Sequence, residues 1–173
     1  MRIVAGKWAG RHLTSPPDRR VRPTAEHVRD EWLKLLHTDL DGARVVDLFA
    51  GTGALGLEAL SRGARHADFV ETRPASLHAL KANVAVLHAR EKTRIFKKDA
   101  LPFAAGLEAG AYDVAFADPP YGSGMLDRQI ESWSRTPFAR ILTVEHAADH
   151  ALPVRGETWD FDETTSVTIY RAP

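Results

Sequence analysis

Two short segments of the chain carry residue types that can do chemistry. The first is an Asp-Pro-Pro-Tyr sequence that directly follows an apolar stretch. Asp118 can accept one N–H of an exocyclic amine on a nucleic-acid base, and the stiff backbone of Pro119 and Pro120 can offer a carbonyl to the other N–H. Tyr121 supplies a ring on which an extruded base can stack. The segment therefore predicts a site that prepares such an amine to accept a methyl group, with a ligand-free rigid turn as the alternative.

The second segment is a glycine loop at residues 51–56, which reads Gly-Thr-Gly-Ala-Leu-Gly, follows an apolar strand and opens a helix. Such loops bind either dinucleotides or S-adenosylmethionine. Asp47, four residues before Gly51, favours S-adenosylmethionine. A carboxylate beside a pyrophosphate is unfavourable, whereas the methyl donor has no phosphate and carries an ammonium and a sulfonium cation.

Two further carboxylates follow predicted strands. Glu71 lies 20 residues after Gly51, the offset at which a carboxylate accepts hydrogen bonds from ribose hydroxyls, and either type of ligand would use it. Asp99 can accept from an adenine amino group, although a loop or helix-cap aspartate explains it almost as well. The residues predicted to bind the donor are Asp47, Phe49, Gly51, Gly53, Glu71, Thr72, Asp99, Ala100 and Asp118.

Alternating strands and helices must position these segments. The hydrophobic pattern predicts strands at residues 44–49, 67–71, 94–97, 112–117, 141–145, 158–161 and 166–170, and helices at residues 54–62, 74–88 and 125–133. Repeated β-α units imply an α/β, Rossmann-like fold with a mostly parallel seven-stranded sheet that ends in an antiparallel hairpin. Ligands of such sheets bind outside the carboxyl ends of the strands. We therefore expect the glycine loop and the Asp-Pro-Pro-Tyr segment to adjoin at one edge of the sheet.

The first 24 residues read differently from the rest. Residues 2–13 predict a short hairpin, and Thr24 can cap a helix whose Val28, Trp32, Leu35 and Leu36 share one face, with Arg29 pointing elsewhere. We predict a basic N-terminal extension over residues 1–24 and a methyltransferase domain over residues 25–173.

Charge is unevenly distributed along the chain. The net charge is zero, but residues 1–29 hold seven basic and two acidic side chains, so this segment is +5 and the remainder −5. A basic arm on an acidic body suits contact with phosphates, although a solvated surface segment is an equally good explanation. The residues predicted to contact RNA are Arg2, Lys7, Arg11, Arg19, Arg20, Arg22, Thr24 and Arg29, and Trp8 could also touch it.

Composition narrows the alternatives further. The chain has no cysteine, so thiolate catalysis and cysteine zinc sites are excluded. No apolar run is long enough to cross a membrane, and the start of the chain does not resemble a secretion signal, so we expect a cytoplasmic protein. His146 and His150 have a spacing that a metal could use on a helix. Because Pro153 follows and no third ligand is evident, we expect a solvated loop and no metal site.

The whole chain resembles the RsmD family, which methylates the N2 amine of one guanine of bacterial 16S ribosomal RNA (guanine 966 in the family). The resemblance rests on residues 2–11 (RIVAGKWAGR), 22–24 (RPT) with Val28-Arg29, 47–64 and 118–121. It implies a class I fold, S-adenosylmethionine as donor, and a target amine held by residues 118–121. It also implies that Asp47, Gly51, Gly53, Glu71 and Asp99 hold the donor, and that the basic arm grips RNA with Arg22 and Thr24 near the pocket. The implied partner is 16S RNA within a 30S subunit or an assembly intermediate, contacted by a monomer. Arg73 departs from the small acidic or amide residue that is common in the family.

Three alternatives remain at this stage. An adenine-N6 methyltransferase would use the same Asp-Pro-Pro-Tyr chemistry, although 173 residues leave little room for a DNA-recognition domain. A dinucleotide-dependent oxidoreductase would use the glycine loop. A non-catalytic RNA-binding protein would retain the pocket without activity.

Overall fold

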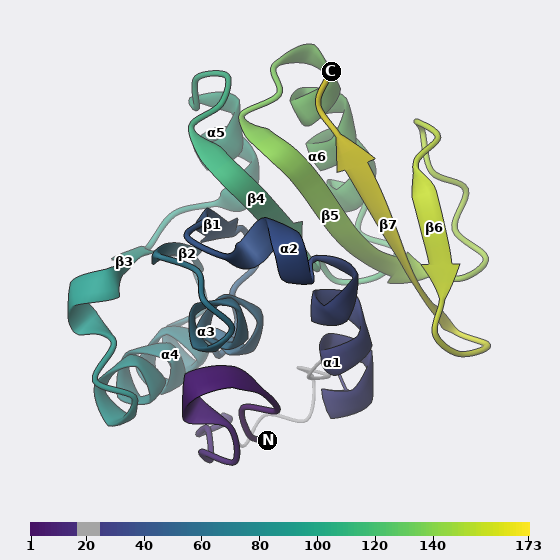
Figure 1. The fold of residues 1–173 in the computed structure, drawn as a ribbon. Coiled ribbons are helices and arrows are strands. Elements are labelled where there is room, and N and C mark those ends of the chain that lie inside the picture. The colour runs from purple at the N-terminus through teal and green to yellow at the C-terminus, as the bar shows by residue number, and fades with distance from the viewer. Residues whose placement is uncertain (17–24) are drawn as a thin grey trace.

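The computed structural model describes residues 1–16 and 25–173 and shows a twisted seven-stranded sheet with helices on both faces (Figure 1). The strand order is β3-β2-β1-β4-β5-β7-β6. The strands are β1 (Arg44–Asp47), β2 (His66–Val70), β3 (Thr93–Phe96), β4 (Tyr112–Ala117), β5 (Ala139–Ala147), β6 (Glu157–Asp160) and β7 (Thr165–Arg171). Strands β1 to β5 are parallel, and β7 pairs antiparallel with both β5 and β6. The predicted mostly parallel sheet with an antiparallel end is confirmed.

The helices form two layers. On one face lie α1 (Glu26–Leu35), α2 (His37–Leu40), α3 (Ala54–Ser61) and α4 (Pro74–Val86), and on the other lie α5 (Ala100–Ala105) and α6 (Met125–Arg135) (Figure 1). Two 3₁₀ turns, η1 (Gly6–Trp8) and η2 (Arg90–Lys92), complete the described elements. Helix α4 begins at a proline, which lacks the N–H that a first helical position leaves unsatisfied. Its predicted apolar stripe is buried against the sheet, at Leu77, Leu80, Val84 and Leu87.

The direction of the strand order changes between β1 and β4. From β1 the chain continues to β2 and β3 on one side, and then returns to add β4 and β5 on the other. The loops that leave β1 and β4 therefore diverge from neighbouring strands at the same edge, which is where doubly wound sheets bind ligands. The glycine loop follows β1, and the Asp-Pro-Pro-Tyr segment follows β4.

The N-terminal region differs in detail from its prediction. The predicted hairpin over residues 2–13 is present as a short antiparallel pairing around η1: Arg2 bridges His12, and the N–H groups of Ile3 and Leu13 donate to the carbonyls of Arg11 and Met1 at 2.9 Å each. Helix α1 starts at Glu26 after Ala25, and Thr24 lies outside the described residues. The buried face of α1 includes Leu33 rather than the predicted Leu35.

The N-terminal segment is also packed on the rest of the molecule. Ile3 and Leu13 belong to the same buried cluster as Trp32 and Val45, which joins them to α1 and to the sheet. The predicted boundary between an N-terminal extension and a methyltransferase domain at residue 24 stays a prediction. No helix within residues 1–16 and 25–173 is long and apolar enough to cross a membrane.

Candidate active site

A cavity of about 560 Å³ opens at the carboxyl edge of the sheet, and both predicted segments line it. This volume lies in the range of pockets that take small molecules and cofactors. Among the predicted site residues, the walls include Asp47, Phe49, Gly51, Glu71, Thr72, Asp99, Ala100, Asp118, Pro119, Pro120 and Tyr121. The N-terminal segment contributes Met1, Ser15 and Pro16, and α1 contributes His27 and Val28. The glycine loop and the Asp-Pro-Pro-Tyr segment thus adjoin, as the sequence predicts.

Asp47 lies at the end of β1 on the cavity wall and is only 1% exposed. Its Oδ2 accepts from the Gly56 N–H at 3.2 Å, and its buried Oδ1 has no hydrogen-bond partner within the described residues. Burial raises the pKa of Asp47 to about 7, and the nearby charges of Asp118 and Glu71 act in the same direction. A buried carboxylate oxygen without a donor suits a cationic ligand, such as the ammonium group of S-adenosylmethionine.

Glu71 ties the glycine loop to the end of β2. Its carboxylate accepts from the Gly51 N–H at 2.9 Å and from the Thr72 and Arg73 N–H groups at 2.8 Å each. Burial alone would raise its pKa, but the hydrogen bonds and charge of Arg73 outweigh burial and lower the pKa below its ordinary value. Glu71 is therefore an ionised acceptor at the place where a ribose is predicted.

Arg73, the departure from the family pattern, has a local role in the structure. Its guanidinium lies 3.3 Å from Glu71 Oε2 and 3.4 Å from Glu71 Oε1, and its side chain is 49% exposed. An ion pair that is half exposed contributes little stability and exchanges readily. Arg73 therefore covers part of the Glu71 carboxylate, the predicted ribose acceptor.

Asp99 caps α5, because its Oδ1 accepts from the Leu101 N–H at 3.0 Å. This is the helix-cap explanation that the sequence left open. Asp99 and Ala100 also line the cavity, and contact with an adenine stays a prediction.

Gly53 is the exception among the predicted donor-binding residues, because it does not line the cavity. It has a φ of +81°, and a Cβ atom there would lie 2.3 Å from Leu80 Cδ1. This glycine lets the loop turn and pack on α4, and its contact with the donor stays a prediction. By contrast, a Cβ on Gly51 would meet no atom within 4 Å.

The Asp-Pro-Pro-Tyr segment reaches the cavity because β4 lies beside β1, with Phe116 paired to Asp47. Tyr121 is 47% exposed, and its hydroxyl donates to Glu145 Oε1 at 3.0 Å. Partial burial raises the pKa of this hydroxyl, and the adjacent charge of Glu145 raises it further. The Tyr121 hydroxyl therefore stays protonated, and its hydrogen bond to Glu145 orients the ring. The exposed ring face is accessible, as a stacking surface requires.

Sequence reasoning missed several residues of the wall, above all Glu145 at the end of β5 and Thr165 at the start of β7. The signal for Glu145 was present, because it closes a predicted parallel strand as Glu71 does. Thr165 carried no such signal, since its place depends on β7 pairing with β5.

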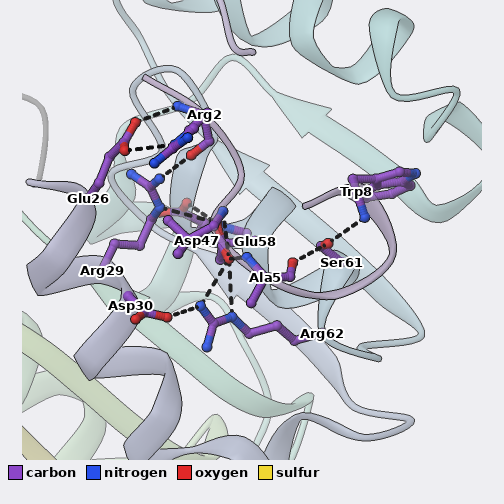
Figure 2. Close-up of polar contacts among 12 residues, drawn as sticks. Arg2, Ala5, Trp8, Glu26, Arg29, Asp30, Asp47, Glu58, Ser61 and Arg62 are labelled. Carbon is purple, nitrogen blue, oxygen red and sulfur yellow. Dashed lines mark hydrogen bonds and ion pairs between the residues drawn. The ribbon is translucent and has the colours of Figure 1, made fainter. Parts of the chain in front are cut away.

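Arg29 is a correction to the predicted RNA surface. Its side chain is fully buried and donates to Glu58 Oε2 at 3.4 Å and to the carbonyl of Arg2 (Figure 2). Glu58, also fully buried, accepts the N–H groups of Val4 and Ala5 at 2.8 to 3.1 Å and pairs with Arg62 at 3.0 Å. Arg29 therefore fastens the N-terminal segment to α3 and cannot contact RNA in this conformation.

The other predicted RNA residues fall into two groups. Arg2 is exposed and pairs with Glu26, Lys7 lies over the Trp8 ring, and Arg11 is exposed. Arg19, Arg20, Arg22 and Thr24 lie outside the described residues.

His146 and His150 do not form the solvated loop that was predicted. His146 lies inside β5, which extends to Ala147, and is buried with its Nε2 at 2.8 Å from Thr168 Oγ1. His150 pairs with Asp127 at 2.7 Å. Within the residues that the structure describes, no three His, Cys, Asp or Glu side chains gather as a metal site would need.

Comparison with known proteins places the chain among methyltransferases. The family model named "Conserved hypothetical protein 95" matches residues 1–167. The Ribosomal RNA small subunit methyltransferase D of Escherichia coli is 33% identical, with 92% of this chain and 81% of the relative covered. The protein of the same name from Haemophilus influenzae is 29% identical, with 99% and 92% covered. A solved structure of the Escherichia coli protein YhhF, assigned as a methyltransferase, superposes with a TM-score of 0.84 at 29% identity over 99% of this chain and 97% of that one.

Proposed function

The chain belongs to the RsmD family of ribosomal RNA small subunit methyltransferases, and on that premise we propose that it transfers a methyl group from S-adenosylmethionine to the N2 amine of one guanine in 16S ribosomal RNA. The observation that carries the proposal is the single cavity shared by the glycine loop and the Asp-Pro-Pro-Tyr segment. A methyl transfer needs donor and acceptor within about 3 to 3.5 Å, so the two sites have to adjoin.

The donor half of the cavity suits S-adenosylmethionine. The buried Oδ1 of Asp47 offers an acceptor to an ammonium group, and Glu71 offers one to ribose hydroxyls. Gly51 leaves open space at the loop. The cofactor would supply a methyl group made electrophilic by its sulfonium. Asp47 also lines the cavity beside the glycine loop and opposes a pyrophosphate there.

The acceptor half prepares the amine. Asp118 accepts one N–H of the target amine, and the backbone of Pro119 offers a carbonyl to the other, so the nitrogen lone pair is exposed toward the methyl group. A nitrogen–carbon bond forms as the carbon–sulfur bond breaks, and the amine then releases its extra proton to Asp118 or to water. Tyr121 holds the extruded base by stacking.

The basic N-terminal segment is the proposed RNA contact. Its exposed cations at Lys7 and Arg11 lie on a segment that also walls the cavity, so RNA bound there would approach the site. We propose that the protein acts as a cytoplasmic monomer on 16S RNA, within a 30S subunit or an assembly intermediate.

Two measurements with purified protein test this function. A titration with S-adenosylmethionine and with NAD should show tight binding of the first alone, because Asp47 disfavours phosphates. Labelled methyl groups should pass from the donor to 16S RNA or to small subunits that lack the mark, and Asp118→Ala should abolish transfer. Tight NAD binding without donor binding would support an oxidoreductase, and donor binding without transfer to either RNA would support a non-catalytic protein.

A further inference from the structure

Glu145 lies on the acceptor side of the cavity and has no role in the chemistry described so far. Strand β5 runs parallel to β4 with Phe116 opposite Thr143 and Ala117 opposite Val144. Continuing this register by one residue places Glu145 beside Asp118. Both residues line the cavity, and the charges of both raise the pKa of the Tyr121 hydroxyl, so the two carboxylates lie near the same group.

The Glu145 carboxylate is built into the wall rather than extended into solvent. The residue is 8% exposed, lines the cavity, and its Oε1 receives the Tyr121 hydroxyl at 3.0 Å. This hydrogen bond fixes the carboxylate relative to the ring on which the base is proposed to stack. An ionised carboxylate has about four lone-pair positions, so it accepts from several donors together.

Two neighbouring carboxylates match one base edge better than another. Guanine presents its N2 amine next to the N1–H group, two donors side by side. Adenine presents its N6 amine next to N1, which carries a lone pair instead of a hydrogen. With Asp118 on the amine, a carboxylate in the adjacent position would gain a hydrogen bond from guanine and face a lone pair on adenine.

We propose that Glu145 determines the base specificity of this site by accepting the N1–H of the target guanine. This inference rests on the proposed function. Asp118 alone activates an amine on either purine, so the choice between guanine N2 and adenine N6 falls to the second acceptor. A hydrogen bond to a charged group is stronger than one between neutral groups, and leaving the carboxylate against a lone pair adds to the discrimination.

The test uses 2-aminopurine, which keeps the amine at position 2 but has a lone pair at N1. Small subunits, or 16S RNA if that is the accepted substrate, carry either guanine or 2-aminopurine at the target position. The unaltered enzyme should show kcat/KM about 10- to 100-fold higher for guanine. In Glu145→Gln the ratio should fall to within about threefold of unity, because the amide can donate to the N1 lone pair. Donor affinity should be unchanged in this variant, which also verifies its fold.

Tyr121→Phe is the matched control, because it removes the hydroxyl bonded to Glu145 and keeps the ring. It should slow transfer to both bases and preserve most of the ratio. Equal rates on guanine and 2-aminopurine in the unaltered enzyme would overturn the inference and leave the proposed function standing. So would a preserved ratio in Glu145→Gln. Absence of transfer to guanine itself would overturn the proposed function and the inference together.

Discussion

The carboxylates at the edge of the sheet differ in how the surrounding residues hold them. Asp47, Glu71, Asp118 and Glu145 line one cavity, yet their surroundings differ. Glu71 receives three backbone N–H groups and an arginine, and its pKa is lowered. Asp47 receives one long hydrogen bond, and its pKa is raised to about 7. Glu71 is therefore charged at neutral pH in the free protein. Asp47 is only partly ionised there, and it becomes charged when a cation binds.

Donor binding should depend on pH through Asp47. Because a bound cation favours the ionised form, binding releases a proton and strengthens as the pH rises toward 7. With a pKa of about 7, about a tenth of the groups are ionised at pH 6 and about three quarters at pH 7.5. Calorimetric titration should therefore show binding of S-adenosylmethionine about eightfold weaker at pH 6 than at pH 7.5.

Asp47→Asn is the control for this pH dependence, since it should bind the donor weakly and equally at both pH values. The stability of the ligand-free protein changes in the opposite sense. A carboxyl group whose pKa is higher in the folded than in the unfolded state contributes stability below about pH 4, and this contribution is lost as the pH rises to about 7. A pH-dependent affinity that persists in Asp47→Asn would contradict the assignment.

At the scale of elements, the two glycines that begin the loop should separate stability from binding. Gly53→Ala forces a Cβ against Leu80 at a positive φ, and should lower the free energy of unfolding by about 2 to 4 kcal/mol. Gly51→Ala meets open space at a φ of +52°, and should cost about 1 to 2 kcal/mol of strain. Its methyl group would stand beside the cavity, so we expect donor affinity to fall at least about tenfold.

Denaturant unfolding and donor titration of both variants check this separation. If Gly53→Ala lost as much donor affinity as Gly51→Ala and kept its stability, Gly53 would be a donor-binding residue.

Helix α3 is held to the N-terminal segment by a buried charge. Glu58→Gln would leave the fully buried Arg29 without its anion and replace one of the two oxygens that accept from the N–H groups of Val4 and Ala5 with an NH2 donor. Loss of one partner of a buried ion pair costs about 3 to 5 kcal/mol. We expect this loss in urea unfolding of Glu58→Gln. Glu26→Gln breaks an exposed pair with Arg2 and should cost less than about 1 kcal/mol. Similar values for the two variants would mean that the buried cluster contributes no more than a surface ion pair.

Local signals in the sequence were enough to predict the sheet and the position of most site residues. A strand that ends in an acidic residue before a glycine or proline loop identifies its own place at the carboxyl edge, as for Asp47 and Asp118. Contacts between residues far apart in the sequence could not be predicted from such local signals. Arg29 is buried because Glu58 meets it from α3, and nothing near Arg29 in the sequence announces that pairing.

Short elements were missed for a related reason. Helix α5 has six residues, one of them a proline, so it carries too few turns to show a periodic pattern. His146 was assigned to a loop because β5 extends past its apolar run, where pairing with β7 continues to Ala147.

At the scale of the whole molecule, the basic side chains of residues 1–29 differ in whether they are free to contact RNA. Among the seven basic residues of the first 29, Arg29 forms a buried ion pair with Glu58, and Arg2 forms an exposed one with Glu26. Lys7 and Arg11 are exposed. The arm therefore presents less charge to RNA than the sequence suggests.

Charge removal from the arm should weaken RNA binding selectively. Arg19→Ala with Arg20→Ala should flatten the dependence of RNA affinity on salt by about 1 to 2 in the log–log slope, and leave donor affinity unchanged. Arg90→Ala with Lys92→Ala removes two exposed cations at η2, before the start of β3 and away from the cavity. This control should alter neither slope nor donor affinity. Equal RNA affinity in both double variants would remove the arm from RNA recognition.

The most direct test of the account is the identity of the methylated nucleoside. Small subunits that lack the mark are incubated with labelled S-adenosylmethionine and the purified protein, and their 16S RNA is digested to nucleosides and separated. We predict label in N2-methylguanosine at a single site. Label in N6-methyladenosine, or none above the level of Asp118→Ala, would contradict it.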